Sequence, residues 1–238
     1  MDAQALENLQ TEAILASGLT YTEYVQQFMG DELHTEWVNG EVIQILNNVQ
    51  HNRILGLLQT LLTLYLRFKA LGEVFPAGVS MYISDDKPAR EPDLMIVFNE
   101  NRHRIEATRL NGPADIVVEI VSPESRDRDT FIKYQEYADA GVREYWLIDP
   151  VRQQADIYQL DEDGRYRRVA LDSDGRMVSP SLPGFALDAE LFWQEDLPTG
   201  AASAAGEVGR SVVGNPEEWH DRQRLLRRGG GFGHALAP

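Results

Sequence analysis

The segment DIVVEIVS at residues 115–122 constrains the fold more than any other part of this 238-residue chain. It is a nearly continuous apolar run, as expected of a central strand that is buried on both faces of a sheet. One carboxylate, Glu119, interrupts the run. A charged group inside such a strand is costly unless it is paired or coordinated. We therefore expect Glu119 to be a metal ligand or a catalytic base; the alternative is a buried ion pair with an arginine or with Lys133.

The N-terminal third predicts a short helix, a hairpin and a long helix. Thr20 or Thr22 can cap the short helix. Asn39-Gly40 lies between two β-prone runs and predicts a hairpin, because both turn residues must take positive φ. Apolar residues three and four apart then predict a helix from about Val49 to Leu71, and we expect Gly72 to end it.

Strands and one more helix are expected in the rest of the chain. The predicted strands are residues 74–84, 92–98 and 115–122, then REYWLIDP and ADIYQL, with a hairpin at Asp163-Gly164. The predicted helix spans about 127–140, ends at Gly141 and has an apolar stripe of Phe131, Tyr134, Tyr137 and Ala138. The closing LPGFALDAELFW should dock its aromatic side chains on the core. This order predicts an α/β (α+β) fold with a mixed sheet flanked by helices.

Three segments are expected along the chain. Residues 1–18 have the character of an N-terminal leader with weak helical tendency, residues 19–198 form the folded domain, and the small, polar and Gly-rich residues 199–238 are expected to be disordered. The leader lacks the basic and apolar regions of a signal peptide, and we expect a cytoplasmic protein without a membrane span. The chain has no cysteine, which excludes disulfides, thiolate metal sites and cysteine nucleophiles.

A second carboxylate and a lysine accompany Glu119. Asp93 stands in REPDLMIV at the start of an apolar strand, and Lys133 lies in the helix that follows the strand of Glu119. Taken alone, Asp93 is more often a turn residue and Lys133 a solvated helix residue. Together the three provide what phosphodiester cleavage needs: carboxylates for a hard dication, a metal that activates water, and a cation near the reacting phosphorus.

The pair P-D at 92–93 and E-I-V at 119–121 resembles the PD-(D/E)XK nuclease superfamily. Five segments are more closely similar to the restriction-endonuclease-like family Uma-two: TEWVNGEVI, NNVQHNRI, REPDLMIV, the block 112–150 and GFALDAELF. The resemblance covers about residues 20–195. It implies that Asp93 and Glu119 hold Mg²⁺ or Mn²⁺ and that Lys133 is the catalytic lysine. Val121 stands where the superfamily motif has its lysine, so Lys133 acts from a displaced position.

The same resemblance adds two candidates to the site. Glu41 would be an additional catalytic carboxylate; the alternative is a solvent-facing acid beside a turn. His51 would be an accessory residue in catalysis or metal binding, and the alternative is a hydrogen-bonded structural residue at a helix start. The implied activity is endonucleolytic hydrolysis of DNA, and paired cuts in a duplex imply a homodimer.

The formal net charge of −16 opposes binding of a polyanion. Two arginine-rich runs are candidates for a local basic patch: Arg102, His103, Arg104 and Arg109, and Arg165, Arg167 and Arg168. Two other functions therefore stay open. One is a non-catalytic or weakly active nucleic-acid-binding or regulatory module on the same fold. The other is a phosphoesterase that acts on a different substrate.

Overall fold

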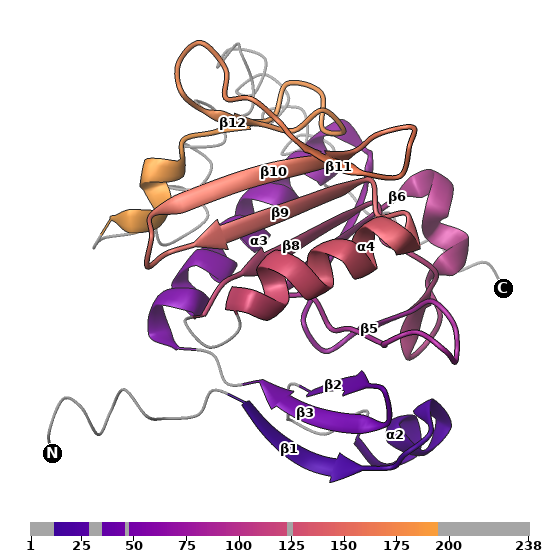
Figure 1. Cartoon of the computed structure of the whole chain (residues 1–238). Coiled ribbons are helices and arrows are strands. Elements are labelled where there is room, and N and C mark those ends of the chain that lie inside the picture. The colour runs from indigo at the N-terminus through magenta and orange to yellow at the C-terminus, as the bar shows by residue number, and fades with distance from the viewer. Residues whose placement is uncertain (1–11, 29–34, 46–47, 123–125, 195–238) are drawn as a thin grey trace, which may run out of the picture.

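A six-stranded sheet forms the centre of the molecule in the computed structural model, which describes residues 12–28, 35–45, 48–122 and 126–194 (Figure 1). The strand order is β11-β10-β9-β8-β6-β4. The strands are β4 (Gly72–Pro76), β6 (Leu94–Phe98), β8 (Ile116–Ile120), β9 (Glu144–Asp149), β10 (Gln154–Leu160) and β11 (Tyr166–Arg168). Only β8 and β9 run parallel to each other; the other neighbours are antiparallel. The predicted mixed sheet is confirmed, and β8 is buried along its whole length in the middle of it.

Helix α3 (Val49–Lys69) covers one face of this sheet. Its apolar positions are buried against β6, β8 and β9, which confirms the predicted helical face. The side chain of Asn48 caps the helix by accepting a hydrogen bond from the backbone N–H of His51. The prediction that Gly72 ends the helix is wrong, because Ala70 takes the left-handed conformation there. Gly72 instead begins β4, where a Cβ atom would overlap the backbone of Val97.

The opposite face of the sheet is covered by η2 (Arg128–Lys133), a π-helical segment, and by α4 (Tyr134–Ala140), which ends at Gly141. The predicted helix is thus correct in extent but not uniform. A π-helix has a wider turn than an α-helix, so the predicted apolar stripe is broken. Tyr137 and Ala138 are buried, whereas Phe131 is 68% exposed.

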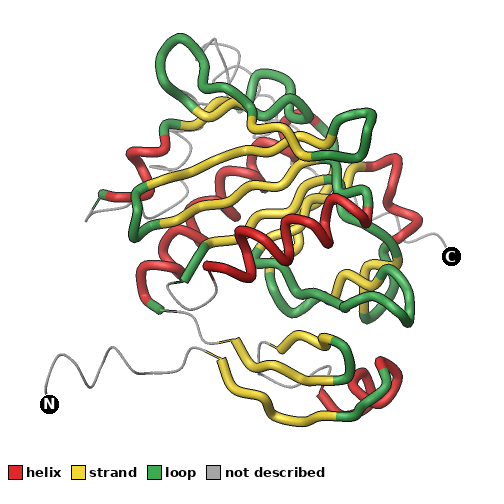
Figure 2. Tube along the Cα trace, viewed as in Figure 1, coloured by secondary structure: helices red, strands yellow, loops and turns green. Residues whose placement is uncertain are grey.

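A smaller three-stranded sheet lies beside the main one (Figure 2). It consists of β1 (Glu12–Ser17), β2 (Thr35–Val38) and β3 (Glu41–Ile45), with α2 (Tyr21–Phe28) next to it. The hairpin at Asn39-Gly40 is confirmed, and both residues have positive φ. Residues 12–17 form a strand instead of the weakly helical leader that we expected, because β3 offers them an unpaired edge. Residues 1–11 and the predicted tail 199–238 lie outside the described residues.

Short elements complete the fold. The run expected as one strand at 74–84 is divided between β4 and β5 (Ser80–Tyr82), which pairs with β7 (Arg109–Asn111) after η1 (Asn99–Arg104). The β10–β11 hairpin at Asp163-Gly164 is confirmed. Elements β12 (Met177–Val178), β13 (Ala186–Leu187) and η3 (Ala189–Trp193) close the chain, and Phe185 and Phe192 dock on the core as predicted. In the described part of the chain, no helix is both long and apolar enough to cross a membrane.

Two sets of contacts join the small sheet to the main one. Trp37 of β2 exchanges two backbone hydrogen bonds with Ala89, in the segment that leads into β6. Tyr24 of α2 donates a hydrogen bond of 3.0 Å to the buried carboxyl of Glu91. Burial raises the pKa of Glu91 to about 7, and the nearby charge of Glu36 adds to the effect. The junction therefore contains an acid that ionises with difficulty.

Two glycine substitutions should have opposite effects on stability. Gly72→Ala forces a methyl group against the Val97 backbone and should lower the free energy of unfolding by about 1 to 3 kcal/mol. Gly56→Ala adds a methyl group to open space on α3 and should raise it by about 0.5 to 1 kcal/mol. Urea denaturation measures both. Equal changes for the two variants would contradict the close approach of β4 to β6.

Replacing Glu91 with glutamine should change how stability depends on pH. Because the folded pKa is raised from 4.5 to about 7, the folded wild type loses stability as pH rises through this window. A neutral glutamine removes that loss, so Glu91→Gln should gain up to about 3 kcal/mol relative to wild type between pH 4 and pH 8. Urea denaturation at both pH values measures the difference.

Glu106→Gln is the matched control for this comparison. Hydrogen bonds from Arg109 and Asn111 lower the pKa of the exposed Glu106 carboxyl, so its replacement should act in the opposite direction. Parallel pH curves for wild type and Glu91→Gln would show that the burial of Glu91 has no such effect.

Candidate functional site

Two acids face each other at one edge of the main sheet. The antiparallel register of β6 and β8 pairs Leu94 with Val118, so one further step places Asp93 opposite Glu119. Directly opposed residues in such a pair have Cβ atoms about 5 Å apart. Leu94 and Val118 both point into the α3 side of the core. The alternation of β8 therefore turns Glu119 toward η2 and α4, whereas Asp93 directly precedes β6 and meets His51 at the start of α3.

Asp93 is held at both of its carboxylate oxygens. Its Oδ2 accepts a hydrogen bond of 2.7 Å from the backbone N–H of Ile120. Its Oδ1 lies 3.0 Å from Nε2 of His51, which projects from the first turn of α3. Asp93 and His51 are both 4% exposed. The structure thus places His51 in direct contact with Asp93, and its accessory role stays a prediction.

The ammonium of Lys133 lies at the centre of the acidic cluster. Its Nζ atom is 2.9 Å from Glu119 Oε1, 2.9 Å from Glu36 Oε1 and 3.6 Å from Asp129 Oδ1. The strand-to-helix return therefore brings Lys133 back to Glu119, and the two form the buried ion pair that was the alternative for Glu119. Tyr137 also donates a hydrogen bond of 2.6 Å to Glu119 Oε1. Lys133 and Tyr137 thus both contact the same oxygen of Glu119.

Glu36 is a member of the cluster that sequence reasoning missed. It stands on β2 and is fully buried, whereas Glu41, five residues later on β3, is exposed. The structure does not bring Glu41 into contact with Lys133, and its role stays a prediction. A hint was present in the sequence, because Glu36 directly precedes the buried Trp37 in the same hairpin. The sequence pattern alone could not decide whether Glu36 or Glu41 is buried against the main sheet.

Burial and neighbouring charges shift the pKa values of the cluster in different directions. Burial raises the pKa of Glu119 to about 8, although Lys133 opposes this, and the charges of Asp129 and Asp93 raise it further. Burial also acts to raise the pKa of Glu36, but Lys133 and Arg90 outweigh it, so this pKa lies below its usual value. The acids in turn raise the pKa of Lys133 against its burial, so the lysine is a permanent cation.

The donor chemistry of the opposed acids suits a hard dication. Mg²⁺ takes oxygen ligands and is commonly held by one or two carboxylates together with water and substrate phosphate. Asp93 and Glu119 supply such oxygens from one edge of the sheet. Within the part of the chain that the structure describes, no group of three or more histidine, aspartate or glutamate side chains forms a complete metal cage. The arrangement fits an ion with two protein carboxylates better than a closed structural site.

The arginine-rich runs do not form a free basic surface. Four of their members pair with carboxylates, namely Arg102 with Glu73, Arg109 with Glu106, Arg167 with Asp161 and Arg168 with Asp156. Other cations lie closer to the acids. Arg126 and Arg152 both approach Asp149, at 3.0 and 3.9 Å. Asp149 ends β9, whose residue Ile148 is paired with Ile120 of β8. One carboxylate thus faces two guanidinium groups near the cluster.

Comparison with known proteins identifies the family and the fold. The model of the Uma2 (Uma-two) family, described as "Putative restriction endonuclease", matches residues 21–190. A crystal structure from Anabaena variabilis, described as "a putative nuclease belonging to DUF820", is similar with a TM-score of 0.61 and 18% identity, over 74% of this chain and 98% of that chain. At this identity the likeness concerns the fold. No curated protein matches the chain. The family match covers most of the folded part, and the chain belongs to the Uma2 family of restriction-endonuclease-like proteins.

Proposed function

We propose that this protein is a metal-dependent endonuclease that hydrolyses phosphodiester bonds in DNA, with Mg²⁺ or Mn²⁺ as its cofactor. One observation carries the proposal: the opposed acids Asp93 and Glu119 lie at a sheet edge with the ammonium of Lys133 at 2.9 Å from Glu119. Burying several acids around one lysine is costly for folding alone. A catalytic use explains that cost.

Asp93 and Glu119 would hold the metal in this proposal. When bound, the metal would polarise the phosphoryl group and lower the pKa of a coordinated water molecule. The backbone N–H of Ile120 and the imidazole of His51 fix the Asp93 carboxylate, so this ligand is oriented before any ion arrives. Lys133 and Tyr137 both contact Oε1 of Glu119, so Oε2 would be its metal-binding oxygen in this proposal.

Lys133 would act on the phosphate. Its raised pKa keeps the ammonium charged, and such a cation stabilises the negative charge that develops on the reacting phosphoryl oxygens or orients the attacking water. The ion pair also favours the ionised form of Glu119, which burial otherwise disfavours. Lys133 thus opposes the effect of burial on Glu119, and a bound metal ion would favour the ionised carboxylate further.

The acidic surface bears on the identity of the substrate. A net charge of −16 weakens attraction to a polyanion, and this favours the second candidate, a weakly active binding module or a phosphoesterase for a smaller substrate. Arg126 and Arg152 offset the charge near the cluster. Paired cuts in duplex DNA would require two sites and hence a homodimer.

Nicking of supercoiled plasmid with Mg²⁺ or Mn²⁺ tests the proposal. The wild-type protein should nick the plasmid, and nicking should stop when the metal ion is chelated. Asp93→Asn and Glu119→Gln should each lose at least about a hundredfold in rate, as is typical when one charge-stabilising group is removed from an active site. Lys133→Met should fall by a similar factor. Circular dichroism should show folded protein in each case.

Glu36→Gln and Glu41→Gln form a matched pair in the same assay. The buried position of Glu36 against Lys133 predicts the larger loss for Glu36→Gln, and a larger loss for Glu41→Gln would restore the role implied by resemblance. Nicking that survives in Asp93→Asn would refute the metal site. DNA binding without nicking would support the binding module, and the absence of any interaction with DNA would support a different phosphoester.

A further inference from the structure

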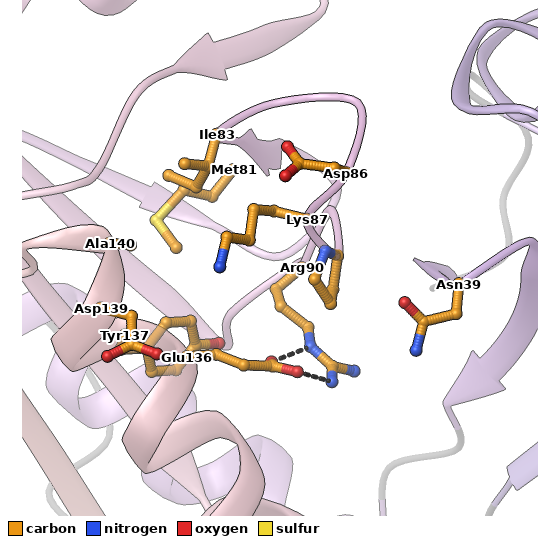
Figure 3. A pocket seen from close by; sticks show the side chains of 11 residues that line it. Asn39, Met81, Ile83, Asp86, Lys87, Arg90, Glu136, Tyr137, Asp139 and Ala140 are labelled. Carbon is orange, nitrogen blue, oxygen red and sulfur yellow. Dashed lines mark hydrogen bonds and ion pairs between the residues drawn. The ribbon is translucent and has the colours of Figure 1, made fainter.

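A chain of ion pairs, called the circuit below, leads from Lys133 through Glu36 and Arg90 to Glu136. Glu36 uses both of its oxygens: Oε1 lies 2.9 Å from Lys133 Nζ, and Oε2 accepts a hydrogen bond of 2.9 Å from Arg90 Nη1. Arg90 also donates from Nε and Nη2 to the two oxygens of Glu136, at 2.8 and 3.0 Å (Figure 3). Glu136 stands on α4, three residues after Lys133. The circuit thus ends on the helix that directly follows the π-helical segment of Lys133.

Burial makes each link of this circuit depend on the next. Glu36 is fully buried, and Arg90 and Lys133 are each 3% exposed. Removal of one partner from such a pair leaves an uncompensated charge in a medium of low dielectric. The planar guanidinium of Arg90 serves two carboxylates in fixed directions, which the single ammonium of a lysine cannot do. The direction of the Glu36 carboxylate is therefore set by Arg90.

We propose that Arg90 is a positioning residue for the reaction at this site. It orients Glu36, and Glu36 holds the ammonium of Lys133 in place against Glu119. Without Arg90, the Glu36 carboxylate loses its guanidinium partner and keeps Lys133 as its hydrogen-bond-distance cation, with the charge of Arg128 nearby, and it draws the ammonium away from Glu119. The inference concerns the placement of Lys133; its consequence for cleavage rests on the proposed nuclease function.

The small sheet thereby becomes part of the active site. Glu36 comes from β2, Arg90 from the segment that pairs with β2, and Lys133 and Glu136 from the helices on the main sheet. Arg90 touches none of the proposed metal ligands in the described structure. Its effect must pass through Glu36, which distinguishes it from a residue that binds the ion or the phosphate.

A cavity of about 260 Å³ gives access to the circuit from the side of α4. Arg90, Glu136 and Tyr137 line it, together with Met81 and Lys87 (Figure 3). Arg90→Ala would extend this cavity toward Glu36. A guanidinium ion from solution can then enter and take the place of the missing side chain between Glu36 and Glu136.

Lysine reactivity tests the placement of Lys133 without reference to cleavage. The chain has three lysines, and Lys69 and Lys87 are exposed whereas Lys133 is buried. An amine-reactive acetylating reagent, followed by peptide mass spectrometry, gives the rate at Lys133 relative to the other two. We expect this relative rate to rise about tenfold or more in Arg90→Ala, because a displaced buried cation gains access to solvent. Millimolar guanidinium should reverse the rise, and equal concentrations of urea or NaCl should not.

Two further variants keep the test decisive. Arg90→Lys retains the positive charge but not the planar guanidinium that reaches two carboxylates. This variant should fold and still show faster acetylation of Lys133. Arg143→Ala removes an arginine that pairs with Glu100 and the buried Asp115, away from the circuit, and should leave Lys133 unchanged. Unchanged Lys133 reactivity in folded Arg90→Ala or Arg90→Lys overturns the proposal, as does a rise that guanidinium leaves unaffected.

Plasmid nicking then separates this inference from the proposed function. Arg90→Ala should lose about tenfold to a hundredfold in kcat, as expected when a reacting group is misplaced by an ångström or so, with KM for DNA nearly unchanged and with recovery in guanidinium. If Arg90→Lys nicks plasmid as fast as wild type does, the positioning role is overturned and the proposed nuclease function stands. Changed Lys133 reactivity in a protein that never nicks would overturn the nuclease and leave the positioning role intact.

Discussion

The ammonium of Lys133 is the charge on which the acidic cluster depends. It lies within 4 Å of three carboxylates, those of Glu119, Glu36 and Asp129, and all four side chains are almost completely buried. Acids packed this closely without a cation would repel one another and take up protons. The lysine offsets part of that repulsion, and in the proposed function the remaining negative charge would attract a divalent ion. The same ion pairs would therefore serve both stability and the proposed chemistry.

The fold is arranged to bring these charges together from distant parts of the chain. The parallel pair β8 and β9 requires a crossover, and η2 with α4 is that crossover. It carries Lys133 back over the strand of Glu119. Helix α3 covers the other face and delivers His51 from its first turn to Asp93. The small sheet closes the remaining side with Glu36. Each element is placed by apolar packing, and the polar residues lie at the ends or edges of that packing.

Sequence reasoning identified the residues whose position follows from local pattern. Glu119 was identifiable because one acid inside an apolar strand is expensive wherever that strand lies. The strand-to-helix return suggested Lys133, whereas Asp93 gained its weight from its neighbour Glu119 and from the family resemblance. Glu36 and Arg90 were not identifiable in this way. In a polar hairpin an acid such as Glu41 is as plausible as Glu36, and only the docking of the hairpin on the main sheet buries one and exposes the other.

The errors in the fold have the same origin. The strand at residues 12–17 exists because β3 offers a free edge, which is a tertiary fact and not a local preference. The π-helical turn before Lys133 directs Asp129 and Lys133 inward, whereas regular helical spacing predicted an inward Phe131. Helix α3 ends with Ala70 as its left-handed C-cap, and Gly72 instead allows β4 to approach Val97 closely.

The distribution of the cluster along the chain also affects when it can exist during folding. Glu36, Asp93, Glu119 and Lys133 come from four separate segments, and the contact between Glu36 and Lys133 closes a loop of 97 residues (133 − 36). Contacts of such long range form late, because the chain must lose the entropy of loop closure before these contacts can stabilise it. A nascent or partly unfolded chain therefore has no complete cluster. A protein that cuts DNA would thus acquire its reactivity only as a finished molecule, and a chain that fails to fold would be harmless to the genome around it.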